Sequence, residues 1–407
     1  MACLSSTDFI PRWQHSLSAD FQQNGVPAGS EPWVTEVTKF AVGGETRVVV
    51  LSADGTTLAA GVGTEVHVYD TATSQLLHTL RDHAGFTVDN LEFHPRGRRL
   101  AASYTRNSPP APLKSLVQVW DLDAAPDLRD EDDLAGAAKE VLTAASQSAV
   151  LSGTLPSFGA RVFSHDGRSL LYRPDRKTVT VVDAATLTER FQLSGHTDAI
   201  MWAETSPNDK VVATSSWDRT VRIWSMESGE SLRVLSRADS QSWAGAFSPD
   251  GDLIAAGAGD GAVRIWGVDT GQLLFTFSGF GGWVRSLAFS PDGLQLAAGS
   301  ESGSLRIIDL KSWECAQSWQ IDVNETGPAL AGPVLEIFGV QYTLRGDLFF
   351  CASDGHMVGY RPSQNLKWDF NRSSVAKGVW FKTFAISKDG SKLVSSLGSN
   401  VGIWKID

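Results

Sequence analysis

The residue types that most often carry catalytic or metal chemistry are scattered along this chain. Its 407 residues include eight histidines and three cysteines. The sequence has no Gly-x-Ser-x-Gly, no phosphate-binding loop, no His-Glu-x-x-His and no closely spaced cysteine pair. His83 and His196 fall in turns, and His67 falls in a strand pattern. We therefore expect no catalytic residues, no metal site and no cofactor, and a protein that is not an enzyme.

The overall charge narrows the class of partner. The chain has 46 acidic and 35 basic residues and a net charge of −11, whereas nucleic acids and anionic membranes attract basic surfaces. We therefore expect neither as a partner. No apolar run approaches the 18 residues of a membrane span, and the first residues lack a secretory signal. Cys3, Cys315 and Cys351 cannot form a disulfide framework. These features predict a protein that is not secreted, in the cytoplasm or alternatively the nucleus.

The elements that position the side chains come from a repeat. A short polar turn between two apolar strands recurs eight times, and five of the seven steps fall in a period of about 40–45 residues. A third strand that ends in a large side chain also recurs eight times. Its copies are Val66–Tyr69, Val117–Trp120, Val179–Val182, Val221–Trp224, Val263–Trp266, Leu305–Ile308, Met357–Tyr360 and Val401–Trp404.

The two ends of the chain fit a closed ring. Only three residues follow Trp404, so the last unit lacks a fourth strand, while 33–42 forms a strand pattern without a unit of its own. We expect this N-terminal strand to complete the last unit and remove the free sheet edges. The predicted organisation is an irregular arm at 1–32 and one domain at 33–407. An acidic and then helical insertion is predicted at 122–147 in the second unit.

The most regular unit is GHTDAIMWAETSPNDKVVATSSWDRTVRIW, residues 195–224. It resembles one unit of the WD40-repeat family. The resemblance implies an all-β, closed β-propeller of eight blades, or seven if 334–370 is not a true blade. It also implies a buried hydrogen-bonded network of His196, Thr214, Asp218 and Trp224, with Ser216 as an alternative to Thr214. In the family this network is structural, so we do not expect a catalytic His–Asp pair.

The same resemblance points to an upper face, where segments enter each innermost strand and where partners bind in this family. The positions that carry over there are rich in aromatic and basic residues, which are enriched at interface hot spots. The predicted partner-binding residues are Trp217, Trp243, Trp283, Arg285, Phe338, Trp380 and Lys382.

The function predicted from these residues is a non-enzymatic scaffold that binds a protein or peptide, as a monomer or as a subunit of a larger complex. Two alternatives stay open. One is a propeller enzyme with polar residues of shifted pKa around the central channel. The other is a binder of a small molecule or sugar, with Trp217, Trp243 and Trp283 as stacking surfaces in a deep pocket. Fold alone does not decide between these functions.

Overall fold

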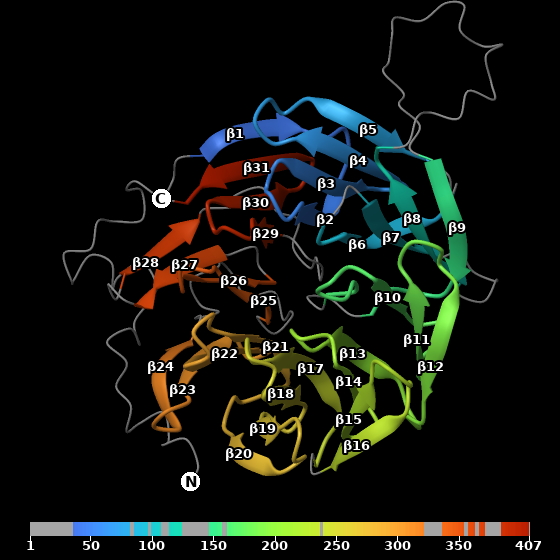
Figure 1. Ribbon diagram of the computed structural model, residues 1–407. Helices are drawn as coiled ribbons and strands as arrows, with labels where there is room; N and C mark the ends of the chain where they lie inside the picture. The colour runs from blue at the N-terminus through green and yellow to red at the C-terminus, as the bar shows by residue number, and fades with distance from the viewer. Residues whose placement is uncertain are drawn as a thin grey trace, which may run out of the picture.

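The computed structural model describes residues 36–81, 85–96, 99–106, 114–123, 146–156, 161–236, 239–320, 336–353, 357–362, 366–370 and 384–406. In this part of the chain, eight antiparallel sheets stand around a central axis as the blades of a propeller (Figure 1). Seven sheets have four strands and one has three. The prediction of an eight-bladed, all-β propeller is therefore confirmed, and the unit near 334–370 is a true blade.

The strands follow the chain blade by blade, from the innermost to the outermost. Blade 1 consists of β2 (Thr46–Leu51), β3 (Thr57–Val62), β4 (Glu65–Asp70) and β5 (Leu76–Leu80). Blade 2 consists of β6 (Thr87–Phe93), β7 (Arg99–Arg106), β8 (Lys114–Asp121) and β9 (Ser146–Ser152). Blade 3 consists of β10 (Ser169–Tyr172), β11 (Thr178–Asp183) and β12 (Glu189–Ser194). Blades 4 and 5 are β13 (Ile200–Thr205), β14 (Val211–Ser216), β15 (Thr220–Ser225), β16 (Ser231–Ser236); β17 (Ser242–Phe247), β18 (Leu253–Ala258), β19 (Val263–Gly267), β20 (Leu273–Phe277).

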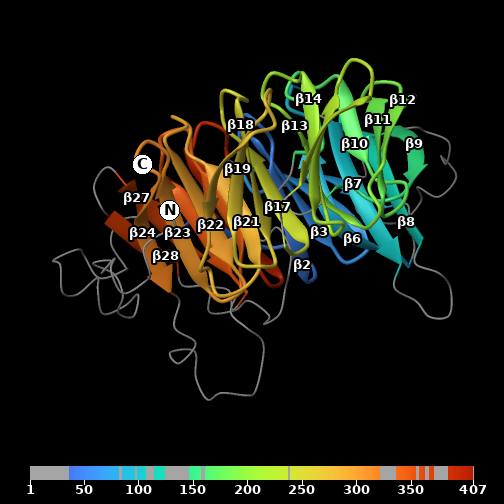
Figure 2. The same cartoon turned by 90° about the horizontal axis from the view of Figure 1, so that it is seen from below.

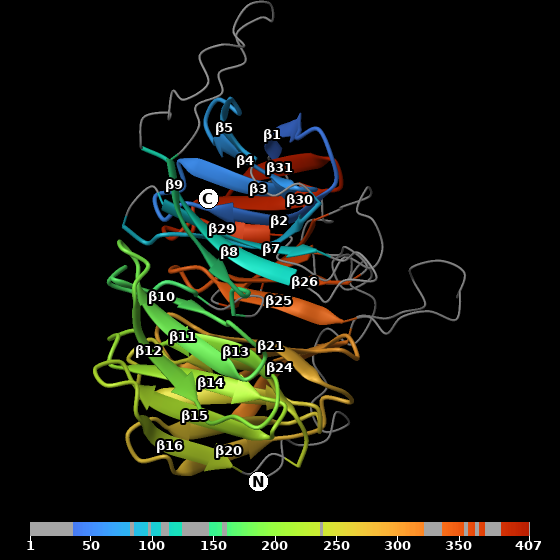
Figure 3. The same ribbon diagram turned by 90° about the vertical axis from the view of Figure 1, so that its right-hand side faces the viewer.

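The remaining blades continue this order. Blades 6 and 7 are β21 (Val284–Phe289), β22 (Gln295–Ser300), β23 (Ser304–Asp309), β24 (Glu314–Gln320); β25 (Ile337–Tyr342), β26 (Leu348–Ala352), β27 (Met357–Arg361), β28 (Leu366–Phe370). Blade 8 is β29 (Phe384–Ile386), β30 (Lys392–Leu397), β31 (Asn400–Lys405) and β1 (Glu36–Ala41). Seen edge-on, the blades stand side by side around the ring (Figure 2 and Figure 3).

The ring closes between the two ends of the described chain. Strand β1 pairs antiparallel with β31, from Glu36 opposite Trp404 to Ala41 opposite Asn400, and the blue and red strands lie together in Figure 1. Lys392 of blade 8 also donates from Nζ to the Gly55 carbonyl of blade 1 at 3.0 Å. The prediction that an N-terminal strand completes the last blade is confirmed.

The hairpin between the first two strands of a blade follows from its sequence. In blade 5 the Ser248 hydroxyl donates to the Asp250 carboxylate at 2.5 Å and accepts from the Leu253 N–H at 2.9 Å. Gly251 then takes a positive φ of 80°, which a glycine adopts without steric cost. In blade 4 Asp209 takes this conformation instead, with φ of 54°. Its carboxylate accepts two backbone hydrogen bonds from the neighbouring hairpin of blade 3.

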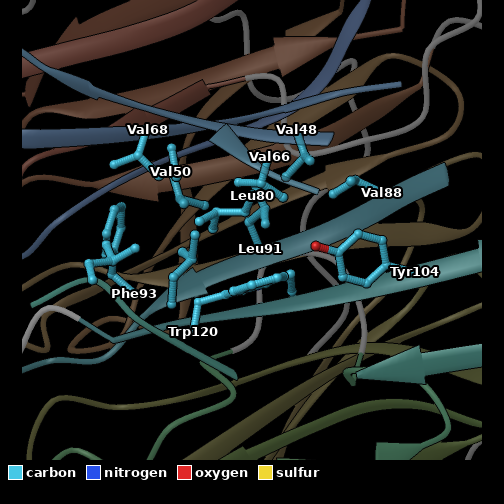
Figure 4. Packing of buried hydrophobic residues seen from close by; sticks show 14 residues of the cluster. Val48, Val50, Val66, Val68, Leu80, Val88, Leu91, Phe93, Tyr104 and Trp120 are labelled. Atoms are coloured by element: carbon cyan, nitrogen blue, oxygen red, sulfur yellow. The ribbon is translucent and has the colours of Figure 1, made fainter. Parts of the chain in front are cut away.

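The core lies mainly between blades. Figure 4 shows the layer between blades 1 and 2, where Leu80, Leu91 and Trp120 pack together. The second strand of each blade is covered on both faces, so β3 is buried along its whole length and has small side chains such as Ala59 and Ala60. Blades that pack on both sides in this way hold the ring rigid and fix the positions of the turns at its faces.

Blade 3 departs from the repeat at its innermost position. There the segment around Val162 and Phe163 replaces a regular strand and contacts β10 through one isolated bridge, Phe163 to Leu170. The predicted arm at 1–32 lies outside the described residues. Most of the predicted insertion at 122–147 does so too, although Leu122 and Asp123 form a turn and β9 begins at Ser146.

Candidate functional site

The upper face is built by one local device that recurs in several blades. The first strand contains a β-bulge near its start, where one extra residue lies between the paired positions. A bulge bends the strand and re-aims the side chain of the extra residue. In blades 4 to 7 these bulged residues are Met201, Trp243, Arg285 and Phe338.

A backbone hydrogen bond ties each bulge to the turn between the second and third strands. The N–H of the turn residue donates to the carbonyl of a residue at or just before the entry of the first strand, at 2.8–2.9 Å. The pairs are Trp217 to Ala199, Gly259 to Gln241, Glu301 to Trp283, and Ser353 to Glu336. In each of these blades the turn between the second and third strands therefore lies beside the start of the first strand.

Three tryptophans from successive blades lie in direct contact there. The rings of Trp217 and Trp243 have centroids 5.9 Å apart at 38°, and those of Trp243 and Trp283 have centroids 5.6 Å apart at 90°. All three residues are partly buried and keep some surface exposed. We call Trp217, Trp243 and Trp283 the tryptophan cluster. Arg176 of blade 3 extends it, since its guanidinium carbon lies 5.6 Å from the Trp217 ring centroid.

Arg285 lies inside this cluster. Its guanidinium carbon is 4.0 Å from the ring centroid of Trp243 and 4.9 Å from that of Trp283, both within the range of cation–π attraction. Its Nη2 donates to Glu301 at 3.1 Å, and its Nε lies 3.7 Å from a carboxylate oxygen of Glu336. The side chain is 16% exposed. The positive charge of Arg285 is therefore already engaged within the chain.

Glycines make room for this arrangement. A Cβ built on Gly259 would lie 2.9 Å from the Trp283 ring, and one on Gly282 would lie 2.8 Å from the Glu301 side chain. Both distances are shorter than carbon atoms tolerate. The sequence indicated only a position in a turn for Gly259 and no role for Gly282. The feature of the sequence that could have revealed this role is a glycine at a position that faces a predicted tryptophan.

Of the other predicted partner-binding residues, the structure describes only Phe338. Phe338 is partly buried and packs against the hydrophobic cluster between blades 7 and 8 that includes Phe349 and Phe384. Trp380 and Lys382 fall outside the described residues. The structure thus brings together four of the seven predicted residues, namely the tryptophan cluster and Arg285.

The buried network of blade 4 is a continuous chain of hydrogen bonds. Trp224 Nε1 donates to Thr214 Oγ1 at 2.9 Å, Thr214 Oγ1 lies 2.7 Å from His196 Nε2, and His196 Nδ1 lies 2.7 Å from Asp218. Ser216 is not a link in it, and its hydroxyl donates to the Asp198 carbonyl. Since an ionised Asp218 only accepts, Nδ1 carries the proton and Nε2 accepts from Thr214.

The electrostatics of Asp218 fit this order. Burial acts to raise the pKa of its carboxyl, but hydrogen bonds from His196 and Thr220 outweigh burial and hold the pKa well below its usual range. The His196 side chain is fully buried and the Asp218 side chain is 4% exposed. The network therefore fixes the turn of blade 4 that begins at Trp217.

Comparison with protein families gives the same repeat. The family described as "WD domain, G-beta repeat" matches residues 187–225, which contain this network. Over this stretch the match confirms the resemblance to the WD40-repeat β-propeller family, and the eight-bladed all-β fold agrees with it. The description "Anaphase-promoting complex subunit 4 WD40 domain" matches a further stretch, residues 246–338, which runs from blade 5 to the start of blade 7.

Relatives of this WD40 propeller include subunit I of eukaryotic translation initiation factor 3 from three fungi. The identity is 36% for Aspergillus niger, 35% for Neosartorya fischeri and 34% for Aspergillus oryzae, each over 85 residues. The match covers 21% of this chain and 25% of each relative. The chain therefore spans about a quarter of the length of these relatives.

Blades 5 and 6 of the WD40 propeller replace the histidine network with arginine. Arg264 on β19 donates to both oxygens of Asp260, at 3.2 and 2.6 Å. Arg306 on β23 donates to the carbonyls of Ser278 and Gly279 and lies over the Phe280 ring. The sequence analysis missed this substitution. An arginine stands at the same place in the third strand of blades 4, 5 and 6, at 222, 264 and 306, but blade 4 also has the histidine network, so the arginine alone does not mark the replacement.

A second pair of charged residues, Asp89 and Arg173, lies near the irregular innermost segment of blade 3. Asp89, the bulged residue of β6, accepts from the Thr105 hydroxyl, and burial raises the pKa of its carboxyl. Burial also lowers the pKa of Arg173 to about 10, although Asp89 acts to raise it. Arg173 donates to the Ile200 carbonyl and to the Thr154 hydroxyl. These bonds link Arg173, which directly follows β10, to blade 4 and to the segment that follows β9.

The upper face also has a hollow of about 570 Å³ between blades 1 and 2. Its lining residues are Gly43, Gly44, Glu45, Arg47, Gly61, Val62, Gly63, Thr64, Glu65, His67, Thr87 and Val88. It lies in different blades from the tryptophan cluster. Within the described residues, no helix has the length and apolar character needed to cross a membrane.

Proposed function

We propose that this WD40 propeller is a non-enzymatic scaffold that binds a protein or peptide partner on the tryptophan cluster of its upper face. The observation that carries the proposal is the direct contact of Trp217, Trp243 and Trp283, contributed by three blades, each residue being only partly buried. Tryptophan buries a large area at an interface, and a few such residues supply most of the binding energy in known complexes.

The rigidity of the cluster supports the same proposal. Its residues are held by ring contacts, by the turn hydrogen bond of Trp217 and by the bulge of Trp243. Side chains that are ordered before binding lose less conformational entropy when a partner arrives. The hollow between blades 1 and 2 is lined by other residues, which favours a contact surface over a stacking pocket for a sugar or small molecule at the tryptophans.

The setting of the partner is also part of the proposal. WD40 domains commonly serve in protein assemblies, and the similarities are to proteins named as subunits, of an anaphase-promoting complex and of a translation initiation factor. We infer that the protein works as a subunit of a larger cytoplasmic complex. The two cysteines that the structure describes, Cys315 and Cys351, are buried thiols, as a reducing compartment allows.

The test is capture of partners from a lysate of the source organism. The wild-type chain is compared with a triple variant, Trp217→Ala/Trp243→Ala/Trp283→Ala, after circular dichroism has shown that both are folded. The matched control, Leu232→Ala/Val234→Ala/Leu273→Ala, removes apolar side chains that are 37–50% exposed on the outer strands β16 and β20. A stoichiometric protein lost only in the tryptophan variant supports the proposal. A partner retained by that variant, or lost equally in the control, refutes it.

A further inference from the structure

The charges around Arg285 carry an inference about the chemistry of the partner, which rests on the proposed function. Two carboxylates, Glu301 and Glu336, lie against one guanidinium. With all three groups ionised, this part of the upper face has an excess of one negative charge. At the Arg285 end of the tryptophan cluster, the two carboxylates therefore outnumber the cation by one.

The two carboxylates are not equivalent. The Glu336 side chain is 7% exposed, whereas the Glu301 side chain is 24% exposed. The hydrogen bond from Arg285 reaches one oxygen of Glu301, Oε2. Arg285 can thus neutralise the buried Glu336, while Glu301 offers its charge to a group that arrives from solvent.

The surroundings of Glu336 agree with this shortage of positive charge. Burial raises the pKa of its carboxyl, Arg285 lowers it, and Glu301 raises it again, so that the net change is a rise. A single guanidinium does not compensate both acids. An added cation near Glu301 relieves the repulsion between the two carboxylates and leaves Arg285 to Glu336.

An anionic partner does not suit the same place. The Nε and Nη1 atoms of Arg285 are buried and have no acceptor among the described residues, so a carboxylate or phosphate from a partner does not reach them. Such a group would also approach Glu301 and Glu336. The indole faces of Trp243 and Trp283, by contrast, already hold one guanidinium at 4.0 and 4.9 Å and attract cations.

We propose that the partner presents a basic side chain, arginine or lysine, to Glu301 at the edge of the tryptophan cluster. The apolar part of that side chain packs on the indole surface and its charge pairs with the carboxylate. Such charge complementarity gives the register and specificity of binding, while the tryptophans contribute the buried area.

The probe for the test is a phage library of random dodecapeptides. The library is selected on the wild-type protein, and peptides that also bind the Trp217→Ala/Trp243→Ala/Trp283→Ala variant are removed. We expect the remaining peptides to be enriched in arginine and lysine relative to the library. A synthetic peptide from this pool is then titrated against the wild type, Glu301→Gln and Glu314→Gln. Glu314 is an exposed carboxylate on β24 of the same blade, so its variant makes the same change in net charge.

We expect Glu301→Gln to weaken binding by about tenfold or more, which is the scale of one charge pair at an interface. Glu314→Gln should leave binding unchanged. The loss should vanish when the basic residue of the peptide is replaced by norleucine, as a double-mutant cycle requires. Thermal melts of both variants that match the wild type exclude unfolding as the cause.

The outcomes separate this inference from the function it rests on. Tryptophan-dependent peptides without basic enrichment, peptides enriched in acids, or equal binding by Glu301→Gln overturn the inference and leave the proposed function standing. The absence of any tryptophan-dependent peptide counts against the proposed function itself.

Discussion

Thr214 holds the buried network of blade 4 together, and replacing its hydroxyl by a methyl group is the sharpest test of that network. Thr214 is fully buried and its Oγ1 lies 2.9 Å from Trp224 Nε1 and 2.7 Å from His196 Nε2. Thr214→Val keeps the shape of the side chain but leaves both nitrogens without a partner. Each buried polar group left unpaired costs about 1–3 kcal/mol. We expect a loss of about 2–5 kcal/mol in the free energy of unfolding.

Thr180 supplies a matched control in the preceding blade, blade 3. It is also fully buried, but its hydroxyl has no hydrogen-bond partner among the described residues. In the folded protein this hydroxyl has lost its hydrogen bonds to water and has gained none in return. Thr180→Val should therefore leave the free energy of unfolding unchanged or raise it by about 1 kcal/mol. Both variants are unfolded in urea and monitored by circular dichroism. The dependence of the unfolding free energy on urea concentration, the m-value, is compared with that of the wild type. Equal shifts in the two variants, or a loss below about 1 kcal/mol for Thr214→Val, would refute the network as an energetic unit.

Three further predictions concern blades 4 and 5. Because the folded pKa of Asp218 lies below its unfolded value of about 4, the contribution of its carboxylate to stability is present above that pH and is lost as the pH falls further. In urea unfolding measured from pH 7 to pH 3, the variant Asp218→Asn should therefore lose less stability than the wild type. An unchanged pH dependence in the variant would contradict this prediction. Arg264→Ala leaves the Asp260 carboxylate without its cation at 2.6 Å and should cost about 2–3 kcal/mol in urea unfolding; a cost under about 0.5 kcal/mol would show that the pair is not a substitute for the histidine network. Gly259→Ala places a Cβ against the Trp283 ring and should change tryptophan fluorescence while the circular dichroism spectrum stays unchanged; an unaltered fluorescence spectrum would mean that the indole has room to spare.

Much of the fold could be predicted from the sequence because the repeat is local. The turn from Ser248 to Gly251 and the strand that ends in Trp266 are complete within a few residues, and each recurs with a regular period. The number of copies then gives the number of blades. The lack of a fourth strand after Trp404 and the spare strand at 33–42 predicted the closure that the structure has in β1 and β31. The innermost segment of blade 3 was not predicted to be irregular, since its turn at His165–Gly167 matches the repeat.

The candidate site could be predicted only as a set of positions. Counting from the turns placed Trp217, Trp243 and Trp283 on one face, because each blade repeats the same path of the chain. Their ring contacts depend on the rotation of one blade against the next and on side-chain rotamers, which are not encoded in any single unit. The same holds for Arg285, whose partner Glu336 comes from the next blade and lies 3.7 Å away.

The sequence by itself determined the class of fold, the count of blades and which side chains were candidates, since these follow from local periodicity and turn chemistry. The tertiary structure alone decided which candidates meet. It showed that Arg285 is neutralised within the chain, that Arg264 replaces a histidine network, and that Phe338 packs between blades 7 and 8. The physical reason is that charge pairing and packing are set by distances across blades, and those distances exist only once the ring has closed.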